Sequence, residues 1–177
     1  ISFWWDYFIF YYFHNINKGL WSSYLLIYVL NINIMIVSLD FDGTLVRTDN
    51  FPVFDPTPLP GLLEALEWMK DNLGAKFILL TQRDHDHVYN PLLGKAVWKK
   101  KGDIHSSVLQ TAINWCKDNG IDLYAVNENP SQRGWSTSRK VYSDLIIDDR
   151  SLLPLDGYGC VDWVETLKII KNRYGKQ

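Results

Sequence analysis

Cysteine is scarce in this chain, and neither sign of charge dominates it. Its 177 residues include two cysteines, Cys116 and Cys160, too few for a disulfide scaffold, so a reducing compartment such as the cytoplasm is expected. With 18 Lys and Arg against 20 Asp and Glu, the net charge is -2, which argues against a surface that coats nucleic acid. The hydrophobic content of 47% excludes a disordered chain, and the length fits one domain with a full core.

Residues 1–34 are poor in charge and rich in aromatic side chains. They hold 12 of the 26 Phe, Trp and Tyr residues, but only two charged residues, Asp6 and Lys18. A secretory signal peptide would carry a basic start and a small-residue cleavage site, and this stretch has neither. The first methionine, Met35, directly precedes the apolar run IVSL.

Three interpretations of this stretch are open. One is a membrane anchor from Leu20 to Val37, although two asparagines interrupt that window and no Lys/Arg cluster flanks it. Another is an interfacial or core-packing helix, although the apolar runs lack a period of 3.6 residues. The third is translated upstream sequence, with the natural protein starting at Met35. We favour the third, so a folded domain is expected over 35–177, and membrane association is expected only if 1–34 is genuine.

From Met35 onward, short apolar runs alternate with helical patterns. Strands are predicted over Ile36–Phe41, Lys76–Leu80, Leu123–Val126, Asp144–Ile147 and, as a short fifth, Gly159–Val161. Strands separated by helical patterns predict an α/β fold, a Rossmann-like three-layer sandwich with a central parallel sheet and helices on both faces. The segments Gln82–Gly102 and Asn127–Thr137 have no strong period and are expected to be polar loops.

Three helices are expected where apolar residues recur at helical spacing. The first runs from Leu62 to Leu73, with Pro60 in its first turn and Gly74 as its stop. The second has Asp103 as its N-cap, uses Ile104, Val108, Ala112 and Trp115 as its apolar face, and stops at Gly120. The third closes the chain over Val164, Leu167 and Ile170.

Acidic and hydroxyl side chains follow the predicted strands. Asp40 and Asp42 follow the first strand, Thr81 the second, and Asp148 and Asp149 the fourth. In open α/β sheets the ligand crevice lies at the carboxyl ends of the strands. Carboxylates brought close together repel one another unless a cation neutralises them, and Mg²⁺ prefers carboxylate, water and phosphate oxygens. The sequence therefore predicts a Mg²⁺ site at this edge.

The same residues resemble the motifs of the haloacid dehalogenase (HAD) superfamily. The string VSLDFDGTLV (37–46) resembles motif I, Phe77–Thr81 resembles motif II, Lys140 stands where motif III has its lysine, and Ile146–Asp149 resembles motif IV. All four motifs occur in order over about residues 35–163. The short chain and its IIDDR string further resemble a group of small bacterial hydrolases of this superfamily.

The resemblance implies a role for each residue. Asp40 would be the nucleophile that forms an aspartyl-phosphate, and Asp42 the general acid and then the base. Thr81 would bind the transferring phosphoryl group, and Lys140 would offset its charge, unless Arg139 or a lysine at 99–101 does so. Asp148 and Asp149 would hold Mg²⁺, together with the Asp40 carboxylate and the Asp42 backbone carbonyl.

The expected function is that of a capless, cytoplasmic, Mg²⁺-dependent phosphohydrolase with an unidentified phosphorylated small-molecule or macromolecular substrate. Only 40 residues separate Asp40 from Thr81, too few for a cap domain besides the predicted helix. One alternative is a polynucleotide-end phosphatase, favoured if Trp98 and the lysines at 99–101 face the site; no stable nucleic-acid partner is otherwise expected. Another is a non-catalytic phospho-acceptor or binding module, which would need no acid–base group at Asp42.

Overall fold

The computed structural model describes residues 34–175, and the expectations for residues 1–33 lie outside the described part. The parallel strands are β1 (Ile36–Leu39), β2 (Lys76–Leu79), β5 (Leu123–Val126) and β6 (Leu145–Ile147). The α-helices are α3 (Leu62–Leu73), α4 (Val108–Asp118) and α5 (Trp163–Tyr174). A hairpin of β3 (His87–Asn90) and β4 (Lys95–Trp98) and a 3₁₀ helix η1 (Pro130–Gly134) complete the set.

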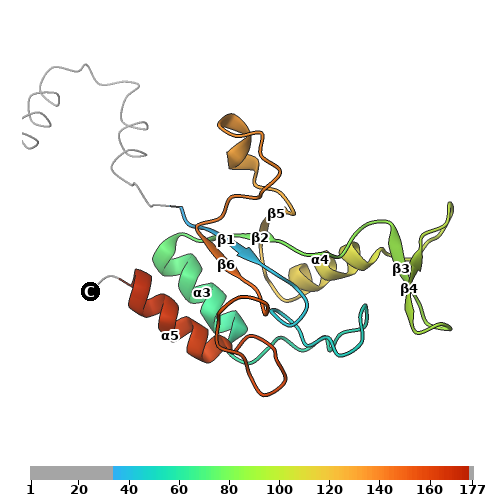
Figure 1. Ribbon diagram of the computed structural model, residues 1–177, viewed down its shortest axis with the longest axis horizontal. Coiled ribbons are helices and arrows are strands. Elements are labelled where there is room, and N and C mark those ends of the chain that lie inside the picture. Colours follow the sequence, from blue (N-terminus) through green and yellow to red (C-terminus); the bar gives the residue numbers. More distant parts are fainter. Residues whose placement is uncertain (1–33, 176–177) are drawn as a thin grey trace, which may run out of the picture. The chain divides into compact units, whose positions relative to one another are not determined.

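The four parallel strands form one sheet in the order β5-β2-β1-β6. Strand β1 is central, with Leu39 opposite Leu79 of β2 on one side and Ile147 of β6 on the other. The predicted α/β class, with a parallel sheet, is confirmed. Because all four strands run the same way, their carboxyl ends meet at one edge of the sheet (Figure 1).

The helices share one hydrophobic core with one face of the sheet. Alternate strand positions contribute Val37, Leu39, Phe77, Leu79 and Ile147 to this core. Buried residues of all three helices join the same cluster, among them Met69, Trp115 and Leu167. Helices α3 and α5 pack against each other on this side (Figure 1).

The opposite face of the sheet does not pack against these helices. Its positions include Ser38, whose hydroxyl is hydrogen-bonded to Ser143, and Ile146, which is 42% exposed. The chain between β5 and β6 crosses over with only η1, so residues 34–175 place no α-helix there. Our expectation of a helical layer on both faces is therefore wrong for the described part: this connection is a polar segment without the apolar period that a packed helix needs.

Several element boundaries differ from those expected. Strand β1 ends at Leu39. Gly61 is the N-cap of α3, so Pro60 precedes the helix and does not lie in its first turn. Helix α4 begins after Ser107, and Ile104 is 94% exposed, so Asp103 is not its cap. The expected strand at Gly159–Val161 is reduced to a single bridge between Leu155 and Val161.

The segment expected as a polar loop after β2 contains an antiparallel hairpin. His87 lies opposite Trp98 and Asn90 opposite Lys95, and Val88 is buried where β3 packs beside α4. The hairpin projects from the end of the molecule at which α4 begins (Figure 1). Among the helices of residues 34–175, none is long and apolar enough to cross a membrane.

Candidate functional site

Three aspartates meet at the carboxyl ends of the two neighbouring strands β1 and β6. Asp40 directly follows β1, and its backbone N–H donates to the carbonyl of Ile147, the last residue of β6 (3.0 Å). Asp148 and Asp149 directly follow that residue. One carboxylate oxygen from each of the three aspartates lies within 4.8 Å of the others. Parallel pairing thus brings together residues more than 100 positions apart, as we predicted.

Burial and neighbouring carboxylates raise the pKa values of Asp40 and Asp149. Burial raises the pKa of Asp40 to about 7, a hydrogen bond from the Phe41 backbone opposes the rise, and the charges of Asp148, Asp42 and Asp149 add to it. Burial, followed by a hydrogen bond and charge repulsion from Asp148, also raises the pKa of Asp149. A cation would relieve this repulsion, and an all-carboxylate donor set matches the hard oxygen ligands that Mg²⁺ takes.

The loop after Asp40 holds Asp149 in place. Gly43 has φ +74°, and a Cβ on it would lie 2.6 Å from Oδ2 of Asp149, so only glycine fits without displacing that carboxylate. The Thr44 hydroxyl accepts a hydrogen bond from the Asp149 backbone N–H (3.0 Å). The Thr44 carbonyl accepts another from the indole of Trp163 at the start of α5 (2.6 Å). The sequence pattern Gly-Thr after the aspartates therefore serves the packing of both strand ends.

Asp42 does not belong to the cluster of Asp40, Asp148 and Asp149, and its carboxylate accepts hydrogen bonds from other residues. Arg83 donates from Nε to Oδ2 (2.9 Å) and from Nη2 to Oδ1 (2.6 Å) of Asp42. The Thr48 hydroxyl donates to the same Oδ1 at 2.6 Å. The sequence analysis placed Asp42 at the metal through its backbone carbonyl, and its side chain is engaged with these donors.

Arg83 is a site residue that the sequence analysis missed. It stands two residues after Thr81, in the segment expected to be a polar loop, yet its side chain is 1% exposed. A basic residue in a polar stretch gives no sign of burial, and no spacing rule links it to Asp42. The only available signal was its closeness to Thr81 at a strand end.

Thr81 is buried beside Arg83 at the end of β2. Its backbone N–H donates to Oδ1 of Asn127 (2.8 Å), which follows β5 with a positive φ of 52°. Its hydroxyl accepts from the backbone N–H of Arg83 (3.2 Å). The strand end after β2 thus carries both the predicted phosphate-binding hydroxyl and the arginine that reaches Asp42.

Lys140 is exposed on the segment between η1 and β6. Its backbone carbonyl accepts from the side-chain amide of Gln132 (2.9 Å), and its N–H donates to the Ser138 hydroxyl (3.1 Å). Within residues 34–175, no hydrogen bond or ion pair joins its ammonium group to another side chain. Lys140 is therefore not brought to the aspartates by any contact, and its role stays a prediction.

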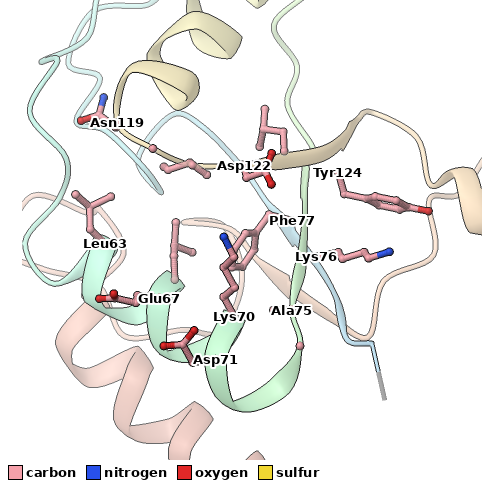
Figure 2. A pocket seen from close by; sticks show the side chains of 15 residues that line it. Leu63, Glu67, Lys70, Asp71, Ala75, Lys76, Phe77, Asn119, Asp122 and Tyr124 are labelled. Atoms are coloured by element: carbon pink, nitrogen blue, oxygen red, sulfur yellow. The ribbon is translucent and has the colours of Figure 1, made fainter. Parts of the chain in front are cut away.

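A cavity of about 810 Å³ lies away from the aspartates. It is bounded by α3 from Leu63 onward and by the residues at and before the starts of β2 and β5, including Lys70, Lys76 and Asp122 (Figure 2). The aspartates, by contrast, follow the carboxyl ends of strands. This cavity therefore lies at the other end of the sheet and has no part in the site described above.

Fold and site together define a mixed α/β protein with a parallel sheet and an acidic cluster at its carboxyl edge. The chain is similar to a solved structure of a conserved protein from Bacteroides thetaiotaomicron, with a TM-score of 0.56 and 27% sequence identity. The match covers 80% of this chain and 93% of that one, and it agrees with a Rossmann-like fold. No family model and no curated protein matches the chain.

Proposed function

We propose that the protein is a Mg²⁺-dependent phosphohydrolase of HAD type that works through an aspartyl-phosphate. The observation that carries the proposal is the convergence of Asp40, Asp148 and Asp149 within 4.8 Å at the strand ends. A phosphate-accepting cluster of this kind needs a nucleophile, a cation site and an acid–base group close together. Asp42, two residues after Asp40, supplies the last of these.

In the first step, Asp40 attacks phosphorus. A bond forms between its carboxylate oxygen and phosphorus, the bond from phosphorus to the leaving oxygen breaks, and Asp42 gives that oxygen a proton. Attack requires the anionic form of Asp40, whose pKa is raised to about 7 by burial and by the neighbouring carboxylates. Asp148 and Asp149, with Asp40, would hold Mg²⁺, which when bound supplies positive charge that favours ionised Asp40 and offsets phosphoryl charge.

In the second step, water attacks the aspartyl-phosphate. Asp42 removes a proton from the water, the bond between phosphorus and the Asp40 oxygen breaks, and inorganic phosphate leaves. Thr81 offers its hydroxyl to the phosphoryl oxygens from the end of the adjacent strand. Lys140 would offset phosphoryl charge, as the resemblance implies, once its exposed chain turns toward the site.

The test is hydrolysis of para-nitrophenyl phosphate with Mg²⁺, after EDTA, and after Mg²⁺ is restored. We expect EDTA to stop turnover, Mg²⁺ to restore it, and Asp40→Asn to abolish it because an amide cannot attack phosphorus. Asp118→Asn, an exposed change at the end of α4, is the matched control and should be as active as the wild type. Turnover by Asp40→Asn, or full activity in EDTA, contradicts the proposal.

A substrate panel then separates the remaining alternatives. Sugar phosphates, nucleotides, phosphopeptides and a 3′-phosphorylated oligonucleotide are offered at equal concentration. Preference for the oligonucleotide would favour a polynucleotide-end phosphatase, for which the exposed Trp98 and the lysines at 99–101 are the available contacts. Stoichiometric phosphorylation without turnover would favour a phospho-acceptor module.

A further inference from the structure

Arg83 is a buried cation to which the proposed steps assign no role. Its side chain is 1% exposed, and a buried charge is costly unless it is paired and hydrogen-bonded. Among residues 34–175 its only ionised partner is Asp42, the proposed acid and base. We infer that Arg83 is a positioning residue that fixes the carboxylate of Asp42 for proton transfer. The inference rests on the proposed phosphohydrolase function.

The contact with Asp42 has the geometry that sets the plane of a carboxylate. Nε of Arg83 donates to one oxygen (2.9 Å) and Nη2 to the other (2.6 Å), so the guanidinium binds both. Such a two-point bond fixes direction as well as distance. The Thr48 hydroxyl adds a third donor at 2.6 Å. Rotation of the carboxylate would break at least two of these bonds.

Proton transfer depends on this orientation. A general acid or base must come within about 3 Å of the oxygen it serves, and the side chain of Asp42 is 27% exposed on its open side. The bonds to Arg83 and Thr48 leave that open side free while restricting the rest of the carboxylate. The restraint therefore acts at the group that must meet the leaving oxygen and later the water.

Arg83 is held so that it acts through Asp42 and not on the substrate. Its guanidinium lies 4.8–5.1 Å from the ring centres of Phe41, Phe51 and Phe54, at distances typical of cation–π contacts. Its Nη2 also donates to the carbonyl of Pro52 (3.1 Å). With aromatic rings around it and with Nε and Nη2 hydrogen-bonded, the guanidinium is held beside Asp42.

The same contacts connect Asp42 to the segment after it. Thr48, Phe51, Pro52 and Phe54 all belong to the stretch between β1 and α3, and all contact either Asp42 or Arg83. The arginine therefore ties this stretch, the end of β2 and the acid–base residue into one unit. A lysine could keep the charge but not the two-point bond.

The experiment is a double-mutant cycle on para-nitrophenyl phosphate turnover with Mg²⁺. Arg83→Met should lower kcat about 10- to 100-fold with KM changed less than threefold. This loss is no larger than the roughly 10²–10⁴-fold contribution of general acid–base catalysis, because Asp42 itself is retained. Arg83→Lys should fall between Arg83→Met and the wild type. In an Asp42→Asn background, Arg83→Met should lower kcat less than threefold further, because the positioned group is already gone. Arg133→Met, which removes an exposed arginine paired with Glu128, is the control and should leave kcat unchanged.

A second cycle covers the case in which loss of a buried arginine unfolds the domain. Thr48→Val removes the other donor to Asp42 from a half-exposed position, and it should lower kcat about three- to tenfold only when Asp42 is present. Equal losses with Asp42 and with Asn at that position, or a change confined to KM, overturn the positioning role. Absence of turnover in the wild type overturns the proposed function itself, so the two failures are distinguishable.

Discussion

The electrostatics of the site depend strongly on Asp40, because burial and the neighbouring carboxylates make its ionised form unfavourable. Between pH 4 and 7 the folded chain keeps a proton on Asp40 that the unfolded chain releases, because the folded pKa is about 7 and the unfolded value is near 3.9. Asp40 therefore contributes stability that is fully present below about pH 4 and is lost as the pH rises through 7. Without metal, the ionised site opposes folding.

This gives the first prediction, for Asp40→Asn in EDTA. At pH 8 the variant should be more stable than the wild type by about 1–3 kcal/mol, and the difference should vanish near pH 4. Urea unfolding at pH 4.5, 6 and 8 measures it. Added Mg²⁺ should reduce the gap at pH 8 by stabilising only the wild type. A difference independent of pH would show that the gain has another cause.

Gly43 provides the second prediction at this scale. Gly43→Ala should destabilise the fold by about 1–2 kcal/mol through its positive φ and also weaken Mg²⁺ binding, because its Cβ would lie 2.6 Å from Oδ2 of Asp149. Gly94→Ala is the matched control, since Gly94 also has a positive φ (61°) but no atom within 4 Å of the added Cβ. Thermal unfolding and Mg²⁺ titration compare the two. Equal loss of Mg²⁺ affinity in both would exclude the contact with Asp149.

Some residues of the candidate site could be predicted from the sequence, and others could not. Asp40 and Asp148 were predictable because parallel strands end at a common edge, whatever their distance in sequence. Arg83 was not, since its burial depends on aromatic rings that lie 29 to 42 positions away in the chain, Phe41, Phe51 and Phe54. Contacts made between loops follow no sequence period.

At the scale of elements, the strongly apolar segments were predicted best. Strand β5 has the predicted bounds, and Gly74 ends α3 in the left-handed conformation expected of a C-terminal glycine. The β3–β4 hairpin was missed because its two strands contain a single buried side chain, Val88. They therefore lack the apolar run that indicated the strands of the parallel sheet.

The start of α4 provides the third prediction. Ser107 is buried, and its hydroxyl accepts from the backbone N–H of Gln110 (3.1 Å), so Ser107→Ala should cost about 1 kcal/mol of stability. Asp103→Ala, at the cap position that the sequence suggested, should change stability by less than about 0.5 kcal/mol because Asp103 caps no helix. Urea unfolding of both variants is the measurement. A larger loss for Asp103→Ala would place the helix start where the sequence put it.

At the scale of the whole molecule, the acidic edge joins elements from both ends of the described chain. Asp40 follows the first strand and Asp148 the last, and the α5 residue Trp163 is hydrogen-bonded to the Thr44 carbonyl between them. A cation bound by these carboxylates would therefore hold β1 and β6 together. Binding at the site and stability of the fold are linked.

The last prediction follows from this link. An ion that binds only the folded chain, present at ten times its dissociation constant, stabilises it by about 1.4 kcal/mol. Mg²⁺ should therefore raise the thermal midpoint by roughly 3–6 °C for a chain of this size. Asp148→Asn removes one carboxylate from the cluster and should lose most of this shift, whereas Asp118→Asn, an exposed change on α4, should keep it. Differential scanning calorimetry at pH 8 with Mg²⁺ and with EDTA measures all three proteins. An equal Mg²⁺ shift in Asp148→Asn and the wild type would mean that the ion binds elsewhere, because only the first lacks a carboxylate of the cluster.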